Sequence, residues 1–278
     1  MFLFGDKFMA SIFNKFSEII IKKKSNVCVG LDPISSRMPI DDLLKFNYEI
    51  IDSTHDLVSA YKPQLAYFES FGPNGLQIMR KIVEYIKNKS DEIIIIGDGK
   101  RGDISTTSEA YAKSLFDLYD FDIVTVNPYM GFDSIEPFLS YEQKGTYILC
   151  KTSNRGSEDF QDLSLKNGDK LYEYIAKKIS TWGSPENLGF VIGATYPDQL
   201  LKMRENLHDF NFLIPGIGEQ GGTVSEVIAA VNHTGKKNNF LINSSRSILY
   251  ASKNKDDFFY YSREKCIELN NKINESLK

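Results

Sequence analysis

Cysteine, histidine and tryptophan are scarce in this sequence of 278 residues, which contains three, three and one of them. The cysteines, Cys28, Cys150 and Cys266, are odd in number and far apart, and none belongs to a CxxC pair. Cys28 and Cys150 lie in apolar runs, where a thiol usually acts as a small hydrophobic side chain. Because the histidines are scattered as well, we expect no structural zinc site.

Long apolar runs and an excess of charge of one sign are also absent. The 33 basic and 37 acidic residues give a formal net charge of −4. This balance provides no general attraction for nucleic acid or anionic membranes, so an anionic ligand must be met by local cations. No apolar run approaches 18 residues, and charges occur too early for a secretory signal. We therefore expect a cytoplasmic protein with reduced thiols and neither nucleic-acid nor membrane partners.

Short β-rich runs alternate along the chain with longer amphipathic segments. Strands are predicted at residues 27–31, 57–62, 92–97, 123–127, 146–151, 189–193, 212–215 and 240–243. Helices are predicted at residues 41–53, 75–87, 107–118, 133–139, 170–180, 197–207, 223–231 and 256–276. The strand runs are continuously apolar, which is typical of parallel strands covered on both faces.

Eight such strands, each followed by a helix, predict the α/β class and a (β/α)8 TIM barrel. The alternative is a doubly wound open sheet, which has the same local pattern but usually carries a glycine fingerprint after its first strand. Here that strand ends in Gly30-Leu31-Asp32-Pro33, which is no such fingerprint. We expect residues 1–278 to form one domain, with residues 1–25 as an N-terminal helical extension that closes the bottom of the barrel.

Polar residues follow nearly every predicted strand, where a barrel places its reacting groups on one face. Only the sixth strand lacks a conspicuous cluster. The others end in Asp32, Lys62, residues 98–103, Asn127, residues 151–154, residues 215–222 and residues 243–247. This asymmetry between the two strand ends indicates an enzyme.

The loop at residues 215–222 has four glycines and leads into the predicted helix at Thr223. Glycines let backbone N–H groups approach an anion, and a helix N-terminus adds partial positive charge. After the eighth strand comes Arg246, whose guanidinium suits phosphate oxygens. Loops seven and eight form the usual phosphate site of such barrels. The alternative is a flexible turn beside a surface arginine.

Two acids and two bases are packed into Asp98-Gly99-Lys100-Arg101-Gly102-Asp103, after the third strand. The spacing of Asp98 and Lys100 places both on one side of an extended strand end. With Lys62 of the neighbouring strand, a chain of alternating charges is predicted that runs Lys62, Asp98, Lys100, Asp103. Buried charges persist only when paired, and such pairing keeps lysines protonated. Four charges on two strands beside the predicted phosphate site favour chemistry, and the alternative is a solvated cluster of ion pairs.

The same residues, continued to Ile104, resemble the D-x-K-x-x-D-I signature of the orotidine 5′-monophosphate decarboxylase family. That motif alone occurs in other sugar-phosphate barrels, whereas five motifs in the family's order are specific to it. The resemblance runs from residue 30 to about residue 250 and is stronger to the subgroup with longer loops. The other four motifs are Gly30-Leu31-Asp32-Pro33, Tyr61-Lys62-Pro63-Gln64, Pro215-Gly216-Ile217-Gly218 with Gln220, and Asn243-Ser244-Ser245-Arg246.

The resemblance implies decarboxylation of orotidine 5′-monophosphate (OMP) to UMP by a homodimer whose sites are shared across the interface, without metal or cofactor. Lys100 is implied to stabilise a carbanion at C6 of the pyrimidine and then to protonate it. The catalytic charges implied are Lys62, Asp98, Lys100 and Asp103. The substrate contacts implied are Asp32 and Lys62 to ribose, Asp103 and Thr107 to the neighbouring subunit's site, Ser153 to the pyrimidine, and Gln220 and Arg246, with Gly216 and Gly218, to phosphate.

Two departures from the family pattern affect the substrate contacts. Ser245 stands where the smallest members have glycine before the arginine, and Lys151-Thr152-Ser153-Asn154 replaces a Met-Ser pattern. Two other functions remain open. One is a metal-dependent lyase or epimerase of sugar phosphates, whose ligands would be Asp98, Asp103 and Glu69. The other is a catalytically silent nucleotide-binding barrel.

Overall fold

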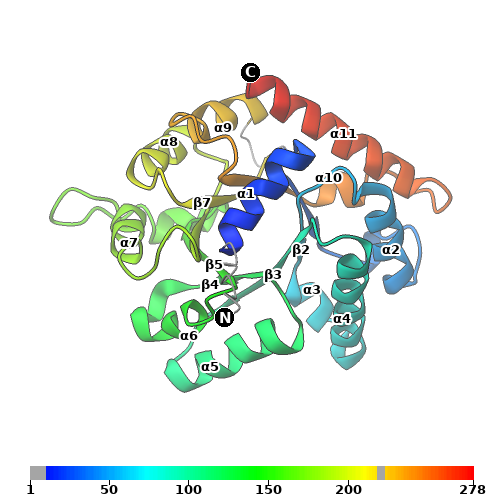
Figure 1. Ribbon diagram of the computed structural model, residues 1–278, viewed down its shortest axis with the longest axis horizontal. Coiled ribbons are helices and arrows are strands. Elements are labelled where there is room, and N and C mark those ends of the chain that lie inside the picture. Colours follow the sequence, from blue (N-terminus) through cyan, green and yellow to red (C-terminus); the bar gives the residue numbers. More distant parts are fainter. Residues whose placement is uncertain (1–10, 218–222) are drawn as a thin grey trace, which may run out of the picture.

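Eight parallel strands pair in the order of the sequence and close into a barrel with helices around it (Figure 1). The computed structural model describes residues 11–217 and 223–278. Strand β1 pairs with β8 as well as with β2, which closes the sheet. The predicted TIM barrel is therefore confirmed, and the open-sheet alternative is wrong. The strands are β1 (Val27–Leu31), β2 (Ala60–Pro63), β3 (Ile94–Arg101), β4 (Ile123–Val126), β5 (Gly145–Lys151), β6 (Leu188–Ile192), β7 (Asn211–Pro215) and β8 (Phe240–Ser244).

Two strands differ from their predicted limits by several residues. Strand β2 begins at Ala60, and β3 continues to Arg101 rather than ending at residue 97. This end of β3 is irregular, because Gly97 pairs with Val124 and Arg101 with Val126. Three residues of β3 therefore lie opposite one residue of β4, which is a bulge. The bulge falls within the charged segment that follows the predicted strand.

Helices follow the strands and cover the outside of the barrel (Figure 1). They are α2 (Leu43–Thr54), α3 (Leu65–Glu69), α4 (Gly72–Lys89), α5 (Ser105–Lys113), α6 (Glu136–Leu139), α7 (Leu171–Ile179), α8 (Pro197–Asn206), α9 (Val224–Val231), α10 (Arg246–Leu249) and α11 (Phe258–Ser276). Single turns are η1 (Ser35–Arg37), η3 (Pro128–Met130), η4 (Phe132–Ser134) and η5 (Arg155–Asp159). The predicted helix at 107–118 is α5 continued by a π-helical turn, η2 (Ser114–Leu118), and 133–139 divides between η4 and α6. Helices α3 and α10 were not predicted.

An additional helix, α1 (Ile12–Lys23), covers the N-terminal end of the barrel. Its apolar face carries Phe13 and Phe16, which are buried with inward-facing strand residues such as Cys28 and Tyr147. The rings of Phe13 and Tyr147 meet edge to face, with centroids 5.3 Å apart. The predicted N-terminal helix is confirmed for these residues, and residues 1–10 lie outside the described part. A second, larger apolar cluster fills the space between the strands and the outer helices.

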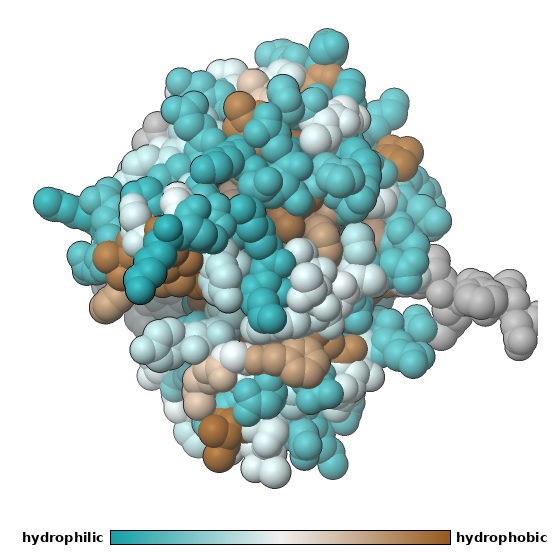
Figure 2. All heavy atoms as spheres, turned by 90° about the vertical axis from the view of Figure 1, so that its left-hand side faces the viewer, coloured by the Kyte–Doolittle hydropathy of each residue, from teal (hydrophilic) through white to brown (hydrophobic). Residues whose placement is uncertain are grey.

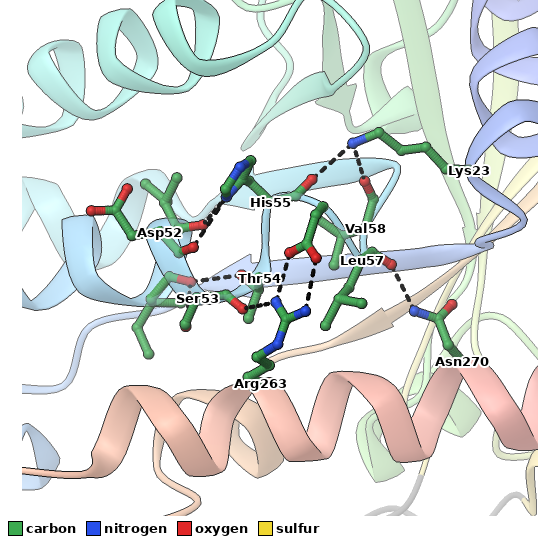
Figure 3. A network of polar contacts seen from close by, with 12 residues as sticks. Lys23, Asp52, Ser53, Thr54, His55, Leu57, Val58, Arg263 and Asn270 are labelled. Carbon is green, nitrogen blue, oxygen red and sulfur yellow. Dashed lines mark hydrogen bonds and ion pairs between the residues drawn. The ribbon is translucent and has the colours of Figure 1, made fainter.

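The loop between α2 and β2 is tied to helices at both ends of the chain (Figure 3). Arg263 of α11 donates to both carboxylate oxygens of Asp56, over 2.7 and 2.8 Å. Asn270 of the same helix donates to the backbone oxygen of Leu57, and Lys23 of α1 donates to the backbone oxygen of Val58. These contacts lie at the end of the barrel opposite the strands' carboxyl ends, so they contribute to the scaffold.

Hydrophilic residues cover most of the side on which α7 and α8 lie, and apolar residues gather there only in small groups (Figure 2). Elsewhere, several large apolar side chains are exposed on the loops that follow β3 and β4, among them Ile104, Tyr129 and Phe132. Within residues 11–217 and 223–278, no helix has both the length and the hydropathy to cross a bilayer.

Candidate active site

A cavity of about 420 Å³ opens at the carboxyl ends of the strands. Apolar residues of β5, β6 and β7, namely Leu149, Val191 and Leu213, lie on one part of its wall. Seven of the predicted site residues line it: Asp32, Lys62, Asp98, Lys100, Ser153, Gly216 and Arg246. Two more, Gly218 and Gln220, lie outside the described residues. The predicted gathering of polar residues at one end of the barrel is thus confirmed for this set.

The carboxylate of Asp98 is the centre of the polar network, and four side chains donate hydrogen bonds to it. Its Oδ2 accepts from Nζ of Lys62 at 2.7 Å and from Nε2 of Gln64 at 2.9 Å. Its Oδ1 accepts from Nζ of Lys100 at 2.6 Å and from Oγ1 of Thr125 at 2.7 Å. Asp98 is only 5% exposed, so these donors replace water around the carboxylate.

The charges in this network hold one another ionised. Burial alone would raise the pKa of Asp98, but the ammonium groups of Lys62 and Lys100 outweigh burial and lower that pKa overall. Burial alone would lower the pKa of Lys62, but Asp98 and then Asp32 outweigh it and raise that pKa. Oδ1 of Asp32 lies 4.0 Å from Nζ of Lys62. The charges therefore alternate in the order Asp32, Lys62, Asp98, Lys100.

Asp103, the predicted fourth member of the series of alternating charges, does not join the network in this structure. Its Oδ1 accepts a hydrogen bond from the backbone N–H of Ile104, at 2.8 Å. Neither Asp103 nor Thr107 lines the cavity. The structure therefore brings together three of the four predicted catalytic charges, Lys62, Asp98 and Lys100. It adds Asp32 next to Lys62, at the other end of this series of alternating charges.

The backbone at Lys100 has a left-handed conformation, with φ of +47°. Residues other than glycine rarely adopt this backbone conformation. The prediction that Lys100 and Asp98 share one side is confirmed, but its reason was wrong, because a bulge rather than an extended strand brings them together. Within the bulge, the N–H of Lys100 donates to Oγ1 of Thr125 at 3.0 Å.

The loop after β5 brings Thr152, Ser153 and Asn154 to the cavity. The residue before them, Lys151, is 1% exposed and does not line the cavity. Its Nζ donates to Asp162 at 2.7 Å and to Ser157 at 3.1 Å, both in the same loop. The rings of Tyr172 and Tyr196 also surround this ammonium, with centroids 5.7 and 5.4 Å away. The contacts of this buried ammonium group hold the loop in place beside the cavity.

The predicted phosphate side is formed by the ends of β7 and β8. Gly216 has φ of +98°, which requires glycine, and Arg246 begins α10 at the edge of the cavity. Ser245 donates from Oγ to the backbone oxygen of Gly30 at 3.0 Å. Its Cβ also fills the space above Gly30, where a Cβ on that glycine would lie 2.9 Å away. The serine that departs from the family pattern thus joins β8 to β1.

Two residues of the network had been given no role from the sequence. Gln64 occurs in one of the motifs, but nothing indicated that it donates to Asp98. Thr125 lies in an otherwise apolar strand and is 1% exposed. The signal that would have found it is the alternation along β4, since it lies two residues before Asn127, on the same side of the strand.

The ligand set of the metal-dependent alternative is not assembled. Glu69 forms an ion pair with Arg101, and Asp103 bonds to the backbone as described above. In the part of the chain that the structure describes, no three His, Cys, Asp or Glu side chains are grouped so as to hold a metal ion.

Comparisons with known proteins give one consistent result. Residues 25–257 match the model of the family described as orotidine 5′-phosphate decarboxylase / HUMPS. The orotidine 5′-phosphate decarboxylase of Flavobacterium johnsoniae is 44% identical over 264 residues, which cover 93% of this chain and 95% of that protein. The OMP decarboxylase of Leishmania donovani is 34% identical with a TM-score of 0.81, covering 95% of this chain and 99% of its own. The UMP synthase of the same organism is 36% identical with a TM-score of 0.84, covering 96% of this chain and 57% of the synthase.

Proposed function

Because this chain belongs to the orotidine 5′-phosphate decarboxylase / HUMPS family, we propose that it removes CO₂ from OMP to form UMP, the last step of pyrimidine biosynthesis. The observation that carries this proposal is the buried carboxylate of Asp98, held between the ammonium groups of Lys62 and Lys100 beside a cavity. This arrangement supports the proposal because it provides a fixed cation that can stabilise the negative charge of the transition state.

The reaction breaks the bond between C6 of the pyrimidine and its carboxyl carbon. The electron pair stays on C6, in the plane of the ring, where no adjacent carbonyl delocalises it. An ammonium group beside C6 stabilises this charge without a reorganisation cost, because it is already in place. We assign that role to Lys100, which then transfers a proton from Nζ to C6 and completes UMP.

Asp98 has two roles in this proposal. Its Oδ1 holds the ammonium of Lys100 at 2.6 Å, so the lysine stays charged and aimed. It also lies near the carboxylate of bound OMP. Two like charges about 4 Å apart, at an effective dielectric constant of about 20, repel by roughly 4 kcal/mol. Binding of ribose and phosphate offsets that repulsion, and stabilisation of the carbanion is the larger contribution.

The remaining contacts are assigned by their place around the cavity. Asp32 and Lys62 bind the ribose hydroxyls, and Ser153 contacts the pyrimidine. Arg246 binds the phosphate together with backbone N–H groups of the loop after β7. From that loop we include Gly216, which lines the cavity, and, on the family motif alone, Gly218 and Gln220.

We propose that two chains form the enzyme, with Asp103 and Thr107 of each completing the site of the other. Exposed apolar side chains beside Asp103 support this, since Ile104 is 57% exposed and Tyr129 is 93% exposed. The segments are neighbours, because the N–H of Asn127 donates to the backbone oxygen of Arg101 at 2.7 Å. We also propose that residues 1–278 act as one domain, since the first and last helices both pack on one barrel.

Loss of the ultraviolet absorbance of OMP on addition of the protein tests this function. The protein is assayed before and after treatment with a chelator, and we expect equal rates. Absence of any reaction would contradict the proposal. A reaction that requires added divalent cation would favour the lyase or epimerase alternative. Binding of UMP without turnover of OMP would favour the silent nucleotide-binding barrel.

A further inference from the structure

We propose that the hydroxyl of Thr125 is a positioning group for the reaction, which holds the backbone of Lys100 directly and its ammonium group through Asp98. The inference rests on the proposed function and assigns a part in it to a residue that does not react. Thr125 lies on β4, is buried, and lines the cavity together with Lys62, Asp98 and Lys100.

The hydroxyl of Thr125 closes a ring of hydrogen bonds around Lys100. Its oxygen accepts from the backbone N–H of Lys100 at 3.0 Å, and its proton is donated to Oδ1 of Asp98 at 2.7 Å. The same Oδ1 accepts from Nζ of Lys100 at 2.6 Å. The backbone and the ammonium of Lys100 are therefore joined through one hydroxyl and one carboxylate oxygen.

This ring explains how an unfavourable backbone conformation persists at Lys100. In the bulge, Asp98, Gly99 and Lys100 all lie opposite Thr125, because the flanking pairs are Gly97 with Val124 and Arg101 with Val126. A regular ladder supplies each N–H with a backbone partner. Here the side chain of Thr125 supplies that partner for Lys100, at the residue whose φ is +47°.

The hydroxyl also limits where the ammonium lies. The side chain of Lys100 is 44% exposed, whereas that of Asp98 is 7% exposed, so the acid is the fixed partner. Thr125 uses its single proton on Asp98, which leaves one orientation for that hydroxyl and orients Oδ1. Without the hydroxyl, the carboxylate is free to rotate towards Lys62 and Gln64, and the ammonium of Lys100 moves with it or turns to solvent.

Substitution of Thr125 by valine tests the proposal, because valine keeps the shape and removes both hydrogen bonds. We expect kcat for OMP to fall about 10- to 100-fold, as for loss of a hydrogen bond to a charged group, with UMP affinity changed less than about threefold. Thr125→Ser retains the hydroxyl and should stay within about threefold of the unsubstituted chain. A valine variant that is folded and equally active would overturn the proposal.

Thr146→Val is the matched control. Thr146 is 1% exposed on the next strand, and its hydroxyl has no hydrogen-bond partner among the described residues. The same chemical change should therefore leave kcat unaltered there. If Thr125→Val does not fold, Thr125→Ser is compared with Thr125→Ala, which differ only in the hydroxyl. Equal kcat values in that pair would also contradict a positioning role.

A measurement without substrate separates this inference from the proposed function. If the unsubstituted chain does not decarboxylate OMP, the function fails, while exchange of the Lys100 amide hydrogen still tests the ring. We expect that amide to be protected in the unsubstituted chain and in Thr125→Ser, and to exchange faster in Thr125→Val. Equal exchange in all three would show that Thr125 does not hold Lys100.

Discussion

The ammonium of Lys100 lies 2.6 Å from a carboxylate oxygen of Asp98, two residues earlier in the same strand. The other oxygen of that carboxylate binds Lys62 at 2.7 Å. One buried acid therefore orients two cations. Because Asp98 holds both ammonium groups, the site offers a fixed positive charge to the proposed carbanion at C6.

Removal of that charge should abolish turnover and leave binding of the product. In Lys100→Ala we expect loss of at least about three orders of magnitude in kcat, since the variant lacks both the cation and the proton donor. UMP affinity should change by less than about tenfold, because the phosphate and ribose contacts remain. Single-turnover assays and UMP titration measure the two effects. Near-normal decarboxylation by the variant would show that another group protonates C6.

Stability should depend on pH through Asp98 in a defined direction. The pKa of Asp98 is lower in the folded chain than the ordinary aspartate value of about 3.9. Its contribution to the free energy of unfolding is therefore complete above that ordinary value, and it disappears as the pH falls towards the pKa in the folded chain. The pKa of Lys62 is raised in the folded chain, so the contribution of Lys62 to the free energy of unfolding disappears only at high pH. Between about pH 5 and 8 neither group titrates, and the contribution is constant.

Urea unfolding of Asp98→Asn measures this contribution. The substitution leaves buried ammonium groups without their main partner, so we expect a loss of roughly 3–5 kcal/mol between about pH 5 and 8, which shrinks below about pH 4. Asp256→Asn, at an exposed position, is the control and should change stability by less than about 0.5 kcal/mol. If the loss in the free energy of unfolding caused by Asp98→Asn grows as the pH falls, the expected direction of the pH dependence is contradicted.

The buried ion pair of Lys151 and Asp162 should affect binding of the pyrimidine but not binding of the phosphate. Asp162→Asn leaves the ammonium of Lys151 buried without its carboxylate, at an expected cost of roughly 3 kcal/mol in the free energy of unfolding. Because Ser153 lies two residues after Lys151 in the same loop, UMP should bind more weakly while ribose 5-phosphate binds as before. Combining Asp162→Asn with Lys151→Met removes the unpaired charge and should recover stability. Equal weakening of both ligands would show that the pair does not act through the loop.

Mixing two inactive variants tests whether the sites are shared between subunits. Lys100→Ala and Asp103→Ala each lack one group, and in a hybrid dimer one site has Lys100 from one subunit and Asp103 from the other. Half of the dimers are hybrids with one intact site, so about a quarter of the original activity should return after dissociation and reassociation. No recovery, in a mixture shown to contain hybrid dimers, would place Asp103 in its own subunit's site.

The barrel was predictable because buried strands and amphipathic helices differ in hydrophobic pattern over several residues. Helices α3 and α10 have five and four residues, which is too short for a helical period to be recognised. The bulge at Lys100 depends on how β3 pairs with β4, and no local sequence pattern determines that pairing. The alternation along β4 indicates which side of the strand Thr125 faces, but its role depends on its hydrogen bond to Asp98 of the neighbouring strand, which the sequence does not show.

The role of Lys100 is tested most directly by a crystal structure of the chain with UMP bound. The distance to be measured joins Nζ of Lys100 to C6 of the pyrimidine. We predict van der Waals contact between these atoms, at about 3–3.5 Å, with Nζ still hydrogen-bonded to Asp98. An ammonium that faces bulk water, several ångströms from C6, would contradict it.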